Sequence, residues 1–203
     1  MNDNHTVTLV EYLLSFKSKT GLAAGLFSAI PILSKLLPES YSAYGFPPLG
    51  TGESVARIGA VVLALAAPLF AFYTASAARK GNRKRVASGI IFAFVCLFLY
   101  FVLFLRFVRT IDIPSKNITV QVSVGYERTD FAKVTFGEIS DEDLLRARGT
   151  SDEEIRKLWT TKSLLVSRSS LYITYVLVFL SLVTAFSWGV FEQSMQPKTT
   201  ASH

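Results

Sequence analysis

The stretch SSLYITYVLVFLSLVTAFSWGVF, residues 169–191, contains no charged side chain. Two further uncharged stretches of similar length occupy residues 58–78 and 86–105. About 20 apolar residues in a helix cover the roughly 30 Å hydrocarbon core of a bilayer. We therefore interpret the three stretches as membrane-spanning helices and the chain as a membrane protein.

The composition supports this interpretation. Hydrophobic residues make up 50% of the 203-residue chain, and 19 of its 36 charged residues lie between residues 111 and 168. That segment has the size of one small folded module, and we call residues 110–168 the polar module. The only cysteine, Cys96, lies inside a spanning stretch, so neither an internal disulfide nor a thiolate metal site is possible.

A shorter uncharged run over residues 20–34 predicts one more span. A helix over residues 21–37 would cross the bilayer if Lys35 extends its ammonium toward the headgroups. A cleaved signal peptide is the competing interpretation, but the first residues of the chain are not basic. The amphipathic residues 6–17 are expected to form an interfacial helix that precedes this span.

These observations predict an all-α integral membrane protein with four transmembrane helices. An N-terminal tail (1–20) carries the interfacial helix, and membrane helices one to three occupy residues 21–109. The polar module (110–168) is inserted between the third and fourth helices. The fourth helix spans residues 169–191, and a disordered tail follows at 192–203.

The polar module is predicted to begin with a β-hairpin. Apolar and polar residues alternate without a break from Ile118 to Tyr126, which is typical of a strand with one buried face. Ala132, Val134 and Phe136 alternate in the same way and predict the partner strand. A hairpin alone is marginal in water, so we expect it to pack on a further element.

Two short helices are predicted to complete a ββαα module. Ser140 precedes an acidic first turn, and Gly149 is a suitable stop for that helix. Ser151 begins a second helix with a capping box, and an apolar stripe there is expected to be buried. The members of this stripe are Ile155, Leu158 and Trp159. The second helix either continues into the fourth span or breaks near residues 160–163.

The spans differ in the side chains that they offer for packing. Small residues four apart in the second span predict a helix-packing seam, although alanine is also simply common in membranes. The seam residues are Ala60, Ala64, Ala67, Ala71 and Ala75. The third span is bulky all round, which favours a lipid-facing position. Hydroxyls on one side of the fourth span predict a polar helix face or a pore lining. They are Thr174, Ser181, Thr184 and Ser187.

A short basic segment separates the second and third spans. Its cations are Arg79, Lys80, Arg83, Lys84 and Arg85, and we expect them to contact lipid headgroups. Short basic loops stay in the cytoplasm, which would place both termini there and the polar module on the other side. Counting every cation opposes this orientation, because 13 of the 21 Lys and Arg would then lie outside. A folded module can cross regardless of its cations, so the short loop carries more weight.

Several kinds of chemistry have no residues to support them. The only histidines are His5 and His203, both in the tails, so a catalytic triad or a histidine metal site is not expected. No charged residue lies within spans two to four, which argues against coupled transport. We expect no enzyme activity, no cofactor, no metal and no nucleic-acid partner.

The sequence therefore favours a non-enzymatic multi-pass membrane protein that acts through assembly. In this hypothesis the polar module senses a ligand or partner and is coupled to the fourth helix. One alternative is an oligomeric channel or membrane-permeabilising effector of the bacterial defence or stress type. Another is a membrane anchor or accessory subunit of a larger complex. The expected partners are the lipid bilayer and either further copies of the chain or other membrane subunits.

Overall fold

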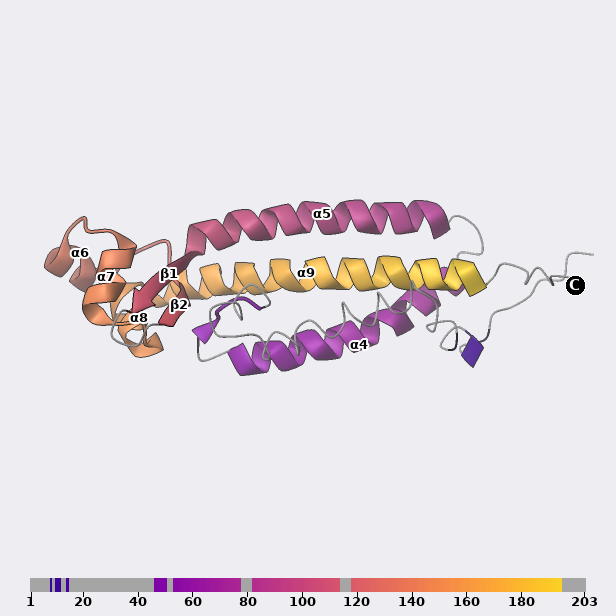
Figure 1. The fold of residues 1–203 in the computed structure, drawn as a ribbon, viewed down its shortest axis with the longest axis horizontal. Helices are drawn as coiled ribbons and strands as arrows, with labels where there is room; N and C mark the ends of the chain where they lie inside the picture. Colours follow the sequence, from indigo (N-terminus) through magenta and orange to yellow (C-terminus); the bar gives the residue numbers. More distant parts are fainter. Residues whose placement is uncertain are drawn as a thin grey trace, which may run out of the picture. The chain divides into compact units, whose positions relative to one another are not determined.

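The computed structural model describes residues 8, 10, 11, 14, 46–50, 53–77, 82–113 and 118–194. Its elements in chain order are α4 (Glu53–Ala77), α5 (Asn82–Phe107), β1 (Val108–Ile113), β2 (Ile118–Ser123), α6 (Asp130–Phe136), α7 (Asp141–Arg148), α8 (Asp152–Leu158) and α9 (Thr161–Ser194) (Figure 1). The predicted first span over residues 21–37, and most of the predicted helix over 6–17, lie outside the described residues.

Among the residues that the structure describes, three helices are long and apolar enough to cross a membrane. The candidate spans are Glu53–Thr74 in α4, Lys84–Phe107 in α5 and Thr161–Phe191 in α9. They match the second, third and fourth stretches of the sequence prediction. Only 25%, 17% and 39% of their most apolar windows is buried, so most of this apolar surface is left for lipid to cover. The structure thus supports a membrane protein.

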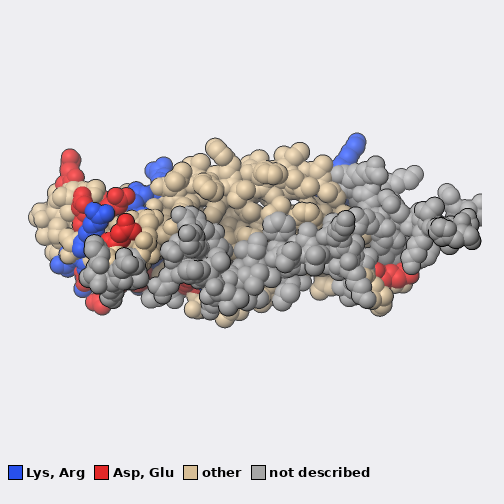
Figure 2. Space-filling view, viewed as in Figure 1, with Lys and Arg blue, Asp and Glu red and all other residues tan. Residues whose placement is uncertain are grey.

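The chain divides into two compact units. One contains the described parts of Val61–Val95 and Val178–His203, and the other contains those of Ile30–Ala60 and Cys96–Leu177. The three long helices contribute to both units, whereas the elements from β1 to α8 belong to the second unit alone. Figure 2 shows acidic and basic side chains gathered over these elements, and few along the visible surface of α5.

The hairpin of the polar module differs from the predicted one. β1 and β2 pair antiparallel, with Val108 opposite Ser123 and Ile113 opposite Ile118. β2 confirms the first predicted strand in a shorter form, but its partner precedes it in the chain. The reason is that α5 ends at Phe107 and the chain continues directly into β1, which places β1 and β2 next to each other in sequence.

The predicted second strand over residues 132–136 is wrong, because this segment belongs to helix α6. The Thr129 side chain accepts a hydrogen bond from the Ala132 amide at 3.2 Å, and Gly137 ends the helix with φ 61°. Ala132 and Phe136 are four residues apart and therefore share a helix face as well as a strand face. The cap at Thr129 followed by Asp130 is the signal for a helix that the alternation concealed.

The two predicted helices of the polar module are confirmed. Ser140 caps α7, which ends at Gly149 with φ 100°, and Ser151 caps α8 through the Glu154 amide. Trp159 leaves the helical conformation, so the chain breaks between α8 and α9 instead of continuing as one rod. With α6 included, the polar module contains a hairpin and three short helices.

The polar module has its own hydrophobic core. Its buried members are Ile111, Val122, Val124, Ala132, Leu144, Leu145, Ile155, Leu158, Trp159 and Leu164. The set includes the predicted stripe Ile155, Leu158 and Trp159, and Val122 of β2. Each fully buried side chain of this size contributes about 1.5 to 3 kcal/mol relative to exposure. Leu164 belongs to α9, so the first turn of the last helix is part of this core.

Candidate functional site at the junction of the polar module and the last helix

A single arginine on α9 connects three elements of the second unit. The Arg168 Nη2 lies 2.6 Å from Asp152 Oδ1 at the start of α8, and its Nε donates to the Ser123 hydroxyl of β2 at 3.0 Å. The Arg168 and Asp152 side chains are only 14% and 16% exposed, and Ser123 is buried. The planar guanidinium can satisfy both partners at once. We call Ser123, Asp152 and Arg168 the module–α9 junction.

The loop that precedes α4 covers this junction. A Cβ atom on Gly50 would lie 2.4 Å from Asp152 Oδ1 and 2.8 Å from Arg168 Nη1. Gly50 also has a φ of +68°, a conformation that other residues rarely adopt. Both facts favour glycine here, because a side chain would strain the backbone and would force the loop or the ion pair to shift.

Further hydrogen bonds join the segment after β2 to the end of α8 and the start of α9. The Glu127 carbonyl accepts from the Thr160 amide at 3.0 Å and from the Ser163 hydroxyl at 3.0 Å. The Thr129 amide donates to the Leu158 carbonyl at 2.9 Å. This close approach depends on Gly125, since a Cβ atom there would lie 2.2 Å from Ser163 Oγ. The start of α9 is thus bonded to the segment between β2 and α6.

A cluster of aromatic rings and a second buried arginine fixes the start of α4 to α9 within the same unit. The Arg57 guanidinium lies 4.4 Å from the ring centre of Phe46 and pairs with Glu53 at 2.6 Å. The Phe46 ring packs edge-on against Tyr175 at 5.1 Å, and the Tyr172 hydroxyl donates to the Ala56 carbonyl at 3.1 Å. Stacking over Phe46 helps to offset the cost of burying Arg57.

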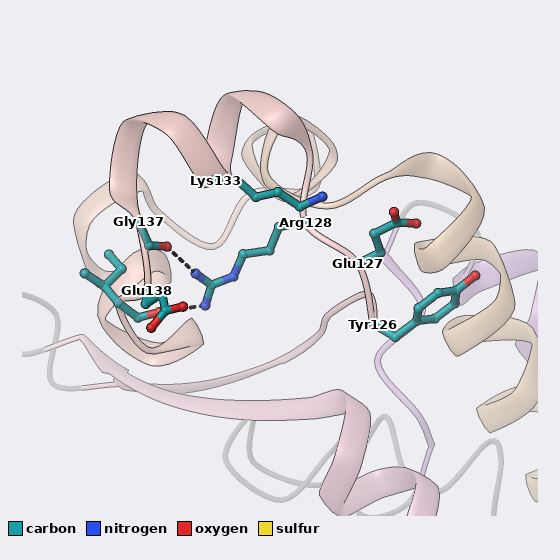
Figure 3. A pocket seen from close by; sticks show the side chains of 7 residues that line it. Tyr126, Glu127, Arg128, Lys133, Gly137 and Glu138 are labelled. Atoms are coloured by element: carbon teal, nitrogen blue, oxygen red, sulfur yellow. Dashed lines mark hydrogen bonds between the residues drawn. The ribbon is translucent and has the colours of Figure 1, made fainter.

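The surface of the polar module carries an open hollow of about 460 Å³. Its lining residues are Tyr126, Glu127, Arg128, Lys133, Gly137, Glu138 and Ile139. Figure 3 shows Arg128 extended toward the turn that contains Gly137, with Glu127 and Tyr126 on the other side of it.

Arg128 has a structural role at the hollow. It donates to the carbonyls of Gly137 and Ile139 at 3.2 and 2.7 Å, and it pairs with Asp141 at 2.7 Å. Asp141 also pairs with Arg109 of β1 at 3.4 Å. Because these bonds occupy the guanidinium, the side chains left to contact a partner at the hollow are the exposed ones, such as Tyr126 and Lys133.

Two of the hydroxyls predicted to form a polar face on α9 donate hydrogen bonds to carbonyls of their own helix. Thr174 donates to the Ser170 carbonyl, and Ser181 donates to the Val178 carbonyl at 2.9 Å. Thr174 and Ser187 are buried, whereas Ser181 and Thr184 are half-buried. Hydroxyls in a membrane helix commonly bond back to the preceding turn. Their pore-lining role stays a prediction.

The alanines of the predicted seam are buried wherever their side chains are described. Ala60, Ala67 and Ala71 are buried, while the side chains of Ala64 and Ala75 lie outside the described residues. Whether they form a dedicated packing seam stays a prediction.

Close helix packing that the sequence analysis missed occurs between α5 and α9 in the first unit. A Cβ atom on Gly89 would lie 3.0 Å from the Ala185 Cβ. Gly89 and Ala93 are four apart, as are Ser181 and Ala185, which lets the two backbones approach closely. The bulky residues elsewhere in α5 concealed this small pair.

The basic segment is described only in part. Arg79 and Lys80 lie outside the described residues, as does the side chain of Arg83. Lys84 is exposed on the first turn of α5, and Arg85 donates to the Thr74 carbonyl at 2.9 Å. Within the described residues, no group of three His, Cys, Asp or Glu side chains could hold a metal ion.

Together, the fold and the junction define a class of protein. Its described residues contain three candidate membrane-spanning helices and a small folded polar module that packs on the start of the last one. The chain matches no protein-family model, and neither a curated protein nor a solved structure is detectably similar to it. Proposals about its function therefore depend on its own geometry.

Proposed function

We propose that this protein is a non-enzymatic membrane protein that acts through assembly. The polar module would bind a ligand or partner, and the module–α9 junction would transmit that event to α9. The observation that carries the proposal is the burial of the Arg168 guanidinium between β2, α8 and the helix on which it sits.

This geometry favours mechanical coupling for an energetic reason. If α9 rotated or tilted without the polar module, Arg168 would lose both Asp152 and Ser123 in a largely dry site. Leaving one member of a buried ion pair without its partner costs about 3 to 5 kcal/mol. A displacement of the polar module is therefore expected to move the start of α9 with it, because separating them is the costlier alternative.

The outer surface of the polar module supports a partner-binding role. Val134 of α6 is 86% exposed, and Tyr126 and Phe131 are also exposed, although these elements lie outside the candidate spans. Exposed apolar groups of this kind, rimmed by charges such as Lys133, are typical of protein interfaces. Tyr126 also lines the hollow beside Arg128.

The assembly half of the proposal is tested on the full chain isolated from its native membrane. Native mass spectrometry is expected to give either a defined homo-oligomer or a stoichiometric complex with another membrane subunit. Ion flux from liposomes that contain the homo-oligomer would identify the channel alternative. A strictly monomeric protein that co-purifies with no other subunit would overturn the proposal.

The coupling half is tested by hydrogen exchange in lipid nanodiscs. The Arg168→Gln variant should raise exchange in α8 and in residues 161–168 together, by at least about tenfold, since each 1.4 kcal/mol lost is tenfold in an equilibrium constant. Arg156→Gln is the matched control, because Arg156 also pairs with Asp152, at 3.0 Å, but is 55% exposed. Increased exchange confined to the turn around residue 168 would contradict coupling.

A further inference from the structure

The first unit contains a second hollow, a groove of about 450 Å³ that involves all three long helices. Its lining residues are Phe70, Thr74, Lys84, Arg85, Ser88 and Trp188. Three of these positions lie at or close to the ends of candidate spans. Thr74 is the last residue of the first span, Lys84 is the first of the second, and Trp188 is close to the end of the third at Phe191. The groove therefore lies at headgroup level.

Hydrogen bonds to one threonine position the walls of this groove. The Trp188 Nε1 donates to the Thr74 hydroxyl at 2.9 Å, and that hydroxyl donates in turn to the Phe70 carbonyl at 3.0 Å. Arg85 donates from Nη1 to the Thr74 carbonyl at 2.9 Å. That carbonyl is in the last turn of α4, where helix carbonyls lack partners of their own, so Arg85 also caps the helix. The site is built before any ligand arrives.

The groove carries positive charge without compensation from its own lining. Lys84 and Arg85 line it, and none of the lining residues that the structure describes is acidic. Among the described residues Lys84 forms no ion pair, and the bond from Arg85 to the Thr74 carbonyl uses only one of the five N–H donors of a guanidinium. Ser88, one helical turn beyond Lys84, is exposed and adds a hydroxyl donor. These groups suit a phosphate.

The remaining lining suits a hydrocarbon chain. The Phe70 ring is exposed on α4, inside the first candidate span, and the indole of Trp188 presents an apolar face beside its bonded N–H. A ligand that satisfies both ends of the groove must combine an anionic phosphate with an acyl chain. Soluble anions would leave the aromatic end exposed.

We propose that this groove binds one anionic phospholipid, with its phosphate on Lys84, Arg85 and Ser88 and an acyl chain along Phe70. The lipid comes from the leaflet that contacts the segment between α4 and α5. This site shares no residue with the module–α9 junction, so its test is independent of the test of the function proposed above.

Native mass spectrometry of the full chain in detergent tests the site with three probes. They are dioleoylphosphatidylglycerol, dioleoylphosphatidylcholine with the same chains, and inorganic phosphate. The first molecule of phosphatidylglycerol to bind should do so at least about tenfold more tightly than the first molecule of phosphatidylcholine. Each surface cation adds about fivefold to the affinity, and the site has two cations. Inorganic phosphate should not compete at millimolar concentration, because it has no chain to bind the aromatic end.

Variants separate the site from general attraction to charge. Lys84→Gln should weaken phosphatidylglycerol binding about fivefold, while Phe70→Ala should weaken both lipids. Lys84→Gln keeps the Arg85–Thr74 bond, so it remains informative if an Arg85 variant does not fold. Arg106→Gln is the matched control, because Arg106 lies at the other end of α5. This variant should not change the binding of the first phosphatidylglycerol molecule.

Three outcomes would overturn the proposal. The first is equal affinity for the two lipids. The second is an equal effect of Lys84→Gln and Arg106→Gln on phosphatidylglycerol. The third is phosphate that binds as tightly as phosphatidylglycerol, which would make the groove a site for a soluble anion.

Discussion

The Arg168 guanidinium lies 2.6 Å from the Asp152 carboxylate, and the two side chains are almost enclosed by β2 and the loop that ends at Gly50. This pair closes the break between α8 and α9. The backbone leaves the helical path at Trp159, yet the charges on either side of the break are in direct contact. A direct ion pair therefore joins the start of α8 to α9 across this break.

Removing either member of this pair is expected to destabilise the second unit. Asp152→Asn should lower the free energy of unfolding by about 3 to 5 kcal/mol, because Arg168 then remains buried without a carboxylate. Arg168→Gln should cost less, because Asp152 keeps its pair with Arg156 at 3.0 Å. The double variant should cost less than the sum of the two. Denaturant unfolding in detergent measures the free energy of unfolding of all three variants. Arg156→Gln is the control and should lower this free energy by less than about 1 kcal/mol, because Arg156 is exposed. Additive losses would show that the pair is not coupled.

Gly50→Ala is expected to displace the loop from the ion pair. The left-handed backbone alone costs about 1 to 2 kcal/mol for a residue with a Cβ, and the clash with Asp152 adds to it. Gly137→Ala is the control, since Gly137 has a similar φ of +61° but no atom within 4 Å of an added Cβ. Thermal unfolding of the two variants should show the larger loss at Gly50. Equal losses would mean that the loop does not contact the pair in solution.

Gly89→Leu is expected to separate α5 from α9 in the first unit. Overpacking a close contact costs about 1 to 3 kcal/mol. Ala87→Leu adds the same side chain at an exposed position of the same helix and should change stability by less than about 0.5 kcal/mol. The comparison is made by denaturant unfolding in detergent. If Gly89→Leu is as stable as Ala87→Leu, the helices do not approach closely at this point.

The salt bridge within α8 should make stability depend on pH at both extremes. The hydrogen bond from Lys157 lowers the pKa of Glu154 below its usual 4.5, and the bond to Glu154 raises the pKa of Lys157 above its usual 10.5. The contribution of Glu154 is complete above pH 4.5 and is lost as the pH falls through its lowered pKa. That of Lys157 is complete below pH 10.5 and is lost as the pH rises through its raised pKa.

Glu154→Gln measures this dependence. The stability difference between the wild type and the variant should be present at pH 7 and should shrink as the pH falls below 4.5. Glu142→Gln, at an exposed position of α7, is the control and should show a smaller difference at pH 7. A difference that stays constant between pH 3 and pH 7 would contradict the assigned pair.

The parts of the fold that depend on local signals were predictable from the sequence. Uncharged runs of about 20 residues identify α4, α5 and the membrane part of α9, because a bilayer excludes charges over its whole thickness. Ser140 and Ser151 identify α7 and α8, because a cap bonds within its own first turn. Local signals failed in α6, because Ala132 and Phe136 are four residues apart and share a face both in a helix and in a strand.

The candidate site was not predictable, because it is built from residues that are distant in sequence. No pattern in the sequence predicts that Arg168 contacts Ser123, 45 positions away, or that Gly50 lies against Asp152. Arg57 and Arg168 stand beside uncharged stretches, where a cation ordinarily reaches the headgroups. The burial of Arg57 depends on the Phe46 ring, and the burial of Arg168 depends on the Asp152 carboxylate, and both come from other parts of the chain.

The sequence by itself determined that this chain belongs to a membrane and that a capped, charged segment interrupts its spans. The physical reason is that hydrophobic length and helix capping act over a few consecutive residues. Only the tertiary structure decided that the polar module is joined to α9 through a buried ion pair, and that two cations meet a tryptophan in one groove. Such contacts depend on the path of the chain in space, which no local pattern records.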